Sequence, residues 1–316
     1  MTQRPAALPA DREDFFERAG GRLRYAVWNA PASGAGGPPR GTVVLVHGRA
    51  EFIEKYAMET VGDLRQRGFA VYALDTRGQG LSSRMLPDHD KGHIDDFSTY
   101  VADLRHFLET VVLPTAPKPL LLFSHSTGGN IALRYLAAEG SRLFAGAAFS
   151  SPMTALPQAR LIRMVLAILN PFRFLDTHYA PGTGPWNPAQ RSFATNDVTH
   201  DERRYRFTDD WFAADPRLRL GGPTIGWLRQ AFRSFSVLDA PACLERIDLP
   251  VLVVSGGEDT VVNTLVHKAV AHRIPGAEHV TIEGARHELL METDARRAQF
   301  WAAFDRLAAR ACPADK

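Results

Sequence analysis

The chain has 316 residues, 45% of them hydrophobic, which is enough to bury the core of one large α/β domain or of one domain with an insertion. Its 37 basic and 35 acidic residues leave a formal net charge of +2, far from the strongly basic surface that binds nucleic acid. The two cysteines, Cys243 and Cys312, lie too far apart in the sequence to suggest a metal-binding pair or a disulfide framework.

The sequence favours a cytoplasmic location. Few and widely spaced cysteines suit a reducing compartment, and residues 1–14 lack the apolar stretch of a secretory signal peptide. No segment reaches the about 18 consecutive apolar residues of a transmembrane helix, and the longest candidate, 161–169, contains Arg163. We therefore expect a cytoplasmic protein, for which a peripheral contact at the inner face of the membrane stays open.

Short apolar runs alternate with helix-length segments along most of the chain. An early hairpin that includes 23–28 comes first, and the Gly- and Pro-rich loop 31–40 joins it to the first parallel strand. Continuous Val, Leu and Ile runs are typical of parallel strands buried on both faces, and such runs occupy 42–47, 69–75, 120–124, 146–150, 251–255 and 279–282. Helical spacing is clearest over 97–112, 130–138 and 296–309. This pattern predicts an α/β fold, with a mostly parallel central sheet flanked by helices.

The alternation stops between Pro152 and about Cys243. Pro, Trp, Arg and Asp become frequent there, no strand pattern continues, and pairs such as Asn170-Pro171 separate short helical stretches. We therefore predict that residues 1–151 form the first part of the core, 152–242 a helical cap or lid insertion, and 243–316 the second part of the core.

A serine lies at the apex of a predicted strand-to-helix turn. The sequence from Ser124 to Gly128 reads Ser-His-Ser-Thr-Gly, which differs from the Gly-x-Ser-x-Gly nucleophile elbow only at its first position. Small residues flank the nucleophile of such a turn because strand and helix approach closely. Ser126 is therefore the candidate nucleophile, although the pentapeptide alone would also suit the Ser-rich start of a helix.

An acid and a histidine follow later strands of the predicted sheet. Asp259 comes just past the carboxyl end of strand 251–255, and His287 lies in the loop after the next strand. Hydrolases built on an α/β sheet carry their triad in the same chain order of Ser, Asp and His. We therefore predict Ser126 as nucleophile, Asp259 as orienting acid and His287 as general base. Weaker rivals with structural or surface interpretations are Ser82, His125, Glu258, His272 and His279.

Acyl transfer also needs hydrogen-bond donors for the developing oxyanion. The backbone amide of Thr127 directly follows the nucleophile, and the amide of Arg49 lies in the loop after strand 42–47. Taken alone, His47-Gly48 would be only a strand-ending turn with a glycine at positive φ. The stretch Asp75 to Gly80 lacks the features of a nucleotide-binding loop and is predicted to be a structural turn behind the oxyanion loop. No metal or organic cofactor enters this chemistry.

With these residues in view, the chain resembles the α/β-hydrolase superfamily, and within it the bacterial lysophospholipases related to monoacylglycerol lipases. The resemblance covers nearly the whole chain. In the core it rests on Gly48 to Glu51, Asp75 to Gly80 and Gly92 to Phe97, and in the insertion on Asn196 to His200, Arg203 to Tyr205 and Gly221 to Thr224.

The resemblance implies a serine hydrolase that cleaves carboxylic esters of lipids through an acyl-enzyme. The expected partner is a small-molecule lipid ester, and the expected reaction releases a fatty acid from a lysophospholipid. The phosphate of its leaving group could meet cap arginines, each of which would also suit an ion-paired surface position: Arg203, Arg204, Arg206, Arg217 and Arg219. The apolar stretch 161–175 could be an acyl-chain wall, a membrane-facing lid or a cap helix packed on the core.

Two other functions stay open at this point. A monoacylglycerol lipase or general carboxylesterase would use the same residues on neutral esters. A catalytically silent hydrolase fold could instead bind a ligand without turning it over, although Ser126, Asp259 and His287 are all present. The sequence specifies neither the head group nor an oligomeric state.

Overall fold

A central sheet of eight strands organises the computed structural model, which describes residues 5–31 and 38–313. The loop predicted at 31–40 therefore lies largely outside the described residues. The strand order is β1-β2-β4-β3-β5-β6-β7-β8, in which β1, β2 and β4 pair antiparallel and every other neighbouring pair is parallel. The strands are β1 (Arg12–Arg18), β2 (Gly21–Trp28), β3 (Gly41–Val46), β4 (Phe69–Leu74), β5 (Leu120–His125), β6 (Gly146–Ser150), β7 (Val251–Gly256) and β8 (Glu278–Ile282).

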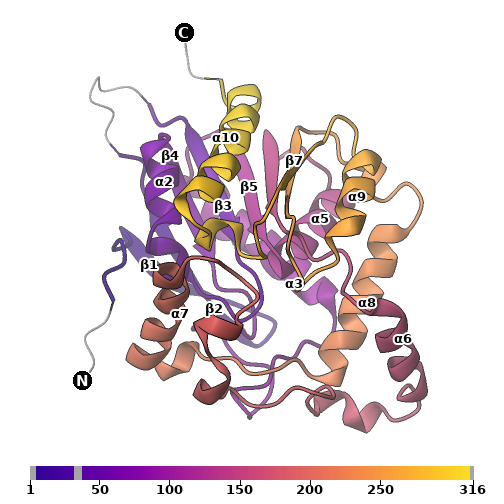
Figure 1. Cartoon of the computed structure of the whole chain (residues 1–316). Coiled ribbons are helices and arrows are strands. Elements are labelled where there is room, and N and C mark those ends of the chain that lie inside the picture. Colours follow the sequence, from indigo (N-terminus) through magenta and orange to yellow (C-terminus); the bar gives the residue numbers. More distant parts are fainter. Residues whose placement is uncertain (1–4, 32–37, 314–316) are drawn as a thin grey trace.

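Helices cover both faces of this sheet (Figure 1). Those that flank it are α1 (Ile53–Ala57), α2 (Thr60–Gln66), α3 (Phe97–Phe107), α5 (Thr127–Glu139), α9 (His267–Arg273) and α10 (Asp294–Ala311). A π-helical turn, η1 (Leu108–Val112), continues α3 into the short α4 (Leu113–Thr115). The predicted α/β fold with a mostly parallel sheet is confirmed.

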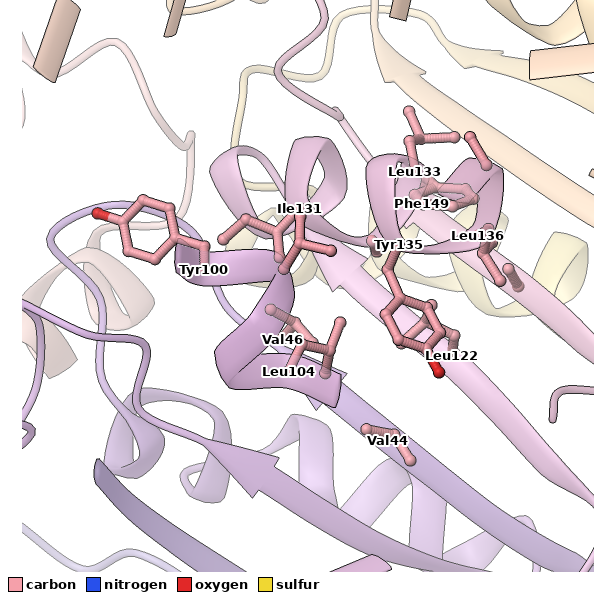
Figure 2. Close-up of a cluster of buried hydrophobic side chains, with 14 of the residues drawn as sticks. Val44, Val46, Tyr100, Leu104, Leu122, Ile131, Leu133, Tyr135, Leu136 and Phe149 are labelled. Atoms are coloured by element: carbon pink, nitrogen blue, oxygen red, sulfur yellow. The ribbon is translucent and has the colours of Figure 1, made fainter. Parts of the chain in front are cut away.

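Alternating side chains of the central strands build two separate cores. Val44 and Val46 of β3 and Leu122 of β5 pack with α3 and α5 on one face, as Figure 2 shows. Val43, Leu45, Leu121 and Phe123 point the other way and pack with α1, α2 and α10. This arrangement follows from the two-residue period of a strand, and it explains why the strands read as unbroken apolar runs.

The first strand of the hairpin has no such run. β1 reads Arg-Glu-Asp-Phe-Phe-Glu-Arg, and most of its side chains are exposed at the edge of the sheet. Charged residues on an edge strand discourage pairing with other chains. The same charges hide the strand from a search for apolar runs.

Between β6 and β7 the described elements are helical. They are α6 (Ala159–Ile168), α7 (Glu202–Ala214) and α8 (Ile225–Asp239), with short 3-10 turns η2 (Arg173–Thr177), η3 (Pro188–Gln190), η4 (Phe193–Thr195), η5 (Pro216–Leu218) and η6 (Leu244–Arg246). In Figure 1 these three α-helices lie in the lower part of the view, α7 on the left and α6 beside α8 on the right. Two more 3-10 turns, η7 (Thr264–Val266) and η8 (Leu289–Met291), belong to the loops after β7 and β8. Of the helices described, none combines the length and apolar character needed to cross a bilayer.

Candidate active site

Ser126 occupies a strained turn between β5 and α5. Its backbone angles are φ 50° and ψ −118°, a conformation that residues other than glycine rarely adopt. The turn is tight because a Cβ at Gly128 would lie 2.2 Å from the carbonyl oxygen of Val46, and one at Gly129 would lie 2.6 Å from the Cβ of Pro152. The small residues that the sequence pattern demands are thus required by the approach of α5 to neighbouring backbone.

The structure brings the three predicted residues together from the ends of β5, β7 and β8. His287 Nε2 lies 3.0 Å from Ser126 Oγ, and His287 Nδ1 lies 2.7 Å from Asp259 Oδ2. All three side chains are almost fully buried. A hydroxyl, an imidazole and a carboxylate in this sequence of contacts can move a proton from serine to histidine.

The carboxylate of Asp259 is held in its ionised form. Burial alone would raise the pKa of Asp259, but the hydrogen bond from His287 and those from the Val261 and Val262 amides outweigh it and lower the pKa. An ionised Asp259 accepts the Nδ1 proton of His287, which leaves Nε2 free to accept the proton of Ser126.

The predicted oxyanion loop lies beside the elbow. A Cβ at Gly48 would lie 3.1 Å from the Cβ of Ser126. A glycine is therefore needed here because the loop backbone passes close to the Ser126 side chain. The amide of Gly48 donates to Glu51 Oε2 at 2.6 Å, and the amide of Ala50 donates to Gln79. Within the part of the chain described, the amides of Arg49 and Thr127 donate to no acceptor, so both stay available to a ligand.

The turn from Asp75 to Gly80 lies behind this loop, as the sequence predicts. Asp75 Oδ1 lies 3.2 Å from Nε2 of His47 and accepts the Ile53 amide. Gly80 has φ +51°, and a Cβ there would collide with the Asp75 carboxylate at 2.1 Å. Through the Asp75 carboxylate, the turn therefore holds both ends of the oxyanion loop.

An ionic network next to the site was not predicted from the sequence. Lys55 Nζ lies 2.7 Å from Glu51 Oε1 and 2.7 Å from Glu288 Oε1, and Tyr56 donates to Glu51 Oε2. Burial alone would lower the pKa of Lys55, but the two carboxylates raise it. The i,i+4 spacing of Glu51 and Lys55 is a sequence signal for half of this network. The network ties the oxyanion loop to the loop that carries His287.

Known proteins resemble this chain over most of its length. The family described as "Serine aminopeptidase, S33" matches residues 37–294. The chain belongs to this family. Lysophospholipase L2 of Escherichia coli K12 is 36% identical over 268 residues, which cover 81% of this chain and 76% of that protein. Monoglyceride lipase of Saccharomyces cerevisiae is 32% identical over 118 residues, or 37% of this chain.

A solved structure shares the fold of this S33-family chain. It is a soluble variant of the Saccharomyces cerevisiae monoglyceride lipase in complex with a substrate analogue, with a TM-score of 0.77 at 20% identity over 99% of this chain and all of that one. Together with the family match and the lysophospholipase L2 relative, this fold confirms the resemblance to α/β-hydrolases of the lysophospholipase and monoacylglycerol lipase branch.

The weaker candidates of this S33-family protein contact other groups or lie away from the triad. His125 Nδ1 lies 3.0 Å from the Ser150 carbonyl oxygen, and burial lowers the pKa of His125 to about 4. Ser82 Oγ donates to the Asp75 carbonyl oxygen at 2.6 Å. His279 Nε2 lies 2.9 Å from Ser255 Oγ, while Glu258 is exposed and faces His200. His272 lies in the last turn of α9.

Two cavities meet at the site of this hydrolase-family chain. The catalytic cavity, of about 300 Å³, contains Ser126 and His287 and has largely apolar walls, among them Met153, Leu156, Trp227, Leu228 and Val262. A second, polar cavity of about 300 Å³ lies beside it. The walls common to both are Arg49, Glu51, Val198 and Glu288.

The cap arginines proposed for phosphate binding do not line the catalytic cavity. Arg203 and Arg204 pair with Glu59, Arg206 pairs with Glu202, and Arg217 pairs with Asp215. Arg219 donates to the Phe212 carbonyl oxygen and lies over the ring of Trp186. The alternative interpretation, in which these arginines are structural, is the one that fits.

Proposed function

We propose that this protein is a serine hydrolase that cleaves the carboxylic ester of a lipid, most of all a lysophospholipid. The observation that carries the proposal is the 3.0 Å contact of Ser126 Oγ with His287 Nε2, backed by the 2.7 Å contact of His287 Nδ1 with Asp259. The proposed catalytic residues are therefore Ser126, His287 and Asp259.

In the proposed reaction, His287 Nε2 accepts the Ser126 proton as Oγ attacks the ester carbonyl. The Arg49 and Thr127 amides stabilise the oxyanion of the tetrahedral intermediate. The intermediate collapses when His287 returns its proton to the departing alcohol, which leaves an acyl-enzyme. His287 then takes a proton from water as the resulting hydroxide attacks the acyl carbonyl, and it returns this proton to Ser126 Oγ as the acyl–oxygen bond breaks, which releases the free acid and regenerates Ser126.

The relatives support a lipid ester as the substrate. The E. coli relative is named a lysophospholipase and the yeast relative a monoglyceride lipase, whereas the family is described as serine aminopeptidases. The apolar walls of the catalytic cavity suit an acyl chain better than a peptide. We expect kcat/KM to rank lysophosphatidylcholine above monoacylglycerol, a short p-nitrophenyl ester and an aminoacyl anilide. A preference for the anilide would contradict the ester assignment.

Covalent labelling tests the nucleophile. A serine-reactive fluorophosphonate should label the wild-type protein and the control Ser98→Ala, whose serine lies on α3, but not Ser126→Ala. Absence of label on the wild type would favour the silent ligand-binding alternative.

We also propose that residues 152–242 form a cap between core parts 1–151 and 243–316, and that its α6 contacts a membrane surface. Leu161, Met164 and Ile168 are 52%, 56% and 65% exposed on this helix. The exposed Arg160 and Arg163 lie among them, which suits an anionic lipid surface. The cytoplasmic location stays a prediction.

A further inference from the structure

We propose that the polar cavity beside the catalytic cavity binds a zwitterionic phosphodiester head group, with the Arg49 side chain at the phosphate and Asp197 at the ammonium. This inference rests on the proposed function, because such a head group belongs to the leaving alcohol of a lysophospholipid ester. It assigns the Arg49 side chain a role separate from that of the Arg49 amide.

The two cavities divide the substrate at the ester. Ser126 and His287 line only the catalytic cavity, where apolar walls suit an acyl chain. The polar cavity is instead lined by hydrophilic residues of the insertion, including Gln190, Ser192, Thr195 and Asn196. Because the acyl and alcohol parts lie on opposite sides of the ester carbonyl, the polar cavity is the place for the alcohol part.

Arg49 stands at the boundary of both cavities, and it is the only arginine among the described walls of the catalytic cavity. Its Nη2 donates to the Gly221 carbonyl oxygen and its guanidinium lies 5.7 Å from the centre of the Trp227 ring. Its Nε is buried without a partner, and among the described residues no carboxylate forms an ion pair with Arg49.

This unneutralised cation keeps its charge at neutral pH. Burial lowers the pKa of Arg49, but only to about 10. A buried guanidinium over an aromatic ring, with its Nε lacking an acceptor among the described residues, is suited to the oxygens of a phosphodiester.

Most other charged side chains around the polar cavity are ion-paired within the protein, although two carboxylates share the single cation of Lys55. Glu51 and Glu288 both pair with Lys55, and Arg191 pairs with Asp209. Asp197 is the exception, since it is exposed and has no ion pair within the described part of the chain. It is therefore available to a cation on the ligand.

The order of these groups matches a zwitterionic lysophospholipid. Ser126 belongs to the catalytic cavity, Arg49 to both cavities and Asp197 to the polar cavity alone. The ester, the phosphate and the ammonium follow one another in the same order along the substrate. The order of the three side chains thus matches the order of the ester, the phosphate and the ammonium along the substrate.

The test uses three monomeric substrates that share one short acyl chain: monoacylglycerol, lysophosphatidylglycerol and lysophosphatidylethanolamine. Relative to monoacylglycerol, Arg49→Gln should lower kcat/KM for both phosphate-containing substrates by about tenfold or more, and Arg49→Lys should restore part of the loss. Asp197→Asn should lower kcat/KM for lysophosphatidylethanolamine about threefold relative to lysophosphatidylglycerol, because only the former carries an ammonium.

Arg206→Gln and Asp210→Asn, in the same insertion but outside both cavities, are the matched controls and should leave all ratios unchanged. Unchanged ratios in Arg49→Gln and Asp197→Asn, with a wild type that cleaves lysophospholipids, would overturn the head-group assignment alone. A wild type that cleaves only monoacylglycerol would overturn the proposed substrate and this assignment with it. Because Asp197 is exposed, its variant remains informative even if Arg49→Gln misfolds.

Discussion

The proposed catalytic residues and the insertion, residues 152–242, differ in how far they are buried and hydrogen-bonded. Ser126 and His287 are almost fully buried at the ends of strands, and hydrogen bonds fix each of them on more than one side. In the insertion, α6 exposes large apolar side chains, and η2, η3 and η4 are short 3-10 turns. The candidate catalytic residues are thus fixed by several hydrogen bonds, whereas α6 keeps much of its apolar surface exposed.

The insertion is nevertheless anchored at defined points. Arg204 of α7 is buried and pairs with Glu59 and Asp294, which belong to the core. Ser234 of α8 donates to Asn130 of α5 at 2.5 Å. Arg229 of α8 donates to the carbonyl oxygens of Leu166 and Leu169 and so holds the end of α6. The anchors thus lie on α7 and α8, and α6 is attached through α8.

Among the proposed catalytic residues, the largest effect is expected for Asp259→Asn. The asparagine amide would hydrogen-bond His287 Nδ1 as a donor, which leaves the proton on Nε2 and prevents it from accepting the Ser126 proton. We expect kcat on a soluble p-nitrophenyl ester to fall about 10⁴-fold without a change in the thermal melting temperature. Glu258→Gln, the exposed neighbour, should retain activity; a loss below tenfold in Asp259→Asn would refute the assigned role.

The ionic network makes a prediction about stability. Lys55→Met leaves the buried Glu51 and the partly buried Glu288 without their shared cation, so the free energy of unfolding in urea should fall by about 3 kcal/mol. Lys268→Met, on the exposed face of α9, should change it by less than about 0.5 kcal/mol. Equal effects of the two substitutions would show that the network contributes nothing.

Acid should lower the stability of the protein, because two buried histidines are neutral in the native state. Burial lowers the pKa of His125 and of His267 from 6.5 to about 4, so both stay neutral in the native state while the unfolded chain binds protons. Stability is therefore complete above pH 6.5 and falls as the pH drops towards 4, by about 2 kcal/mol per histidine at pH 5.

Urea unfolding at pH 7 and pH 5 measures this loss. His267 Nδ1 lies 2.7 Å from Ser255 Oγ and Nε2 lies 2.8 Å from the Pro152 carbonyl oxygen. In His267→Gln the loss between pH 7 and pH 5 should be smaller by about 2 kcal/mol. An unchanged pH dependence in this variant would contradict the lowered pKa of His267.

The smallest effect on stability is expected at α6. Serine at Leu161, Met164 and Ile168 should change the free energy of unfolding by less than about 0.5 kcal/mol each, because these side chains are exposed. The triple variant should hydrolyse a lipid in anionic vesicles about fivefold more slowly than the wild type, yet a short soluble ester equally fast. Leu143→Ser, before β6 at the opposite end of the sheet, is the control.

Leu166 would be a poor position for the same test. It is 8% exposed and packs into the main core, so its loss would destabilise the protein by about 2 kcal/mol or more. Parallel decreases on vesicles and on the soluble ester in the triple variant would show that α6 shapes the cavity and does not contact the lipid surface.

Much of the core was predictable because buried parallel strands leave an unmistakable apolar pattern. The ends of β5, β7 and β8 could be located, and with them Ser126, Asp259 and His287. β1 could not, since its charges suit an exposed edge. Glu288 could not be linked to Lys55, because only the folded sheet brings their loops together.

The insertion was less predictable for a related reason. Its helical character follows from Pro and Gly spacing, but whether an arginine there meets a ligand or a carboxylate depends on partners distant in the sequence. Arg204 shows this most clearly, since Glu59 and Asp294 come from opposite ends of the chain.

The pairing of β6 with β7 across the whole insertion also bears on how the protein is made. A ribosome that has synthesised β6 must add the insertion before Val251–Gly256 can pair with it. Until then the apolar edge of β6 is open, which makes the nascent chain prone to association and a client for chaperones. Ser126 is synthesised early, but His287 arrives only after β8, so a truncated product has the serine without its base.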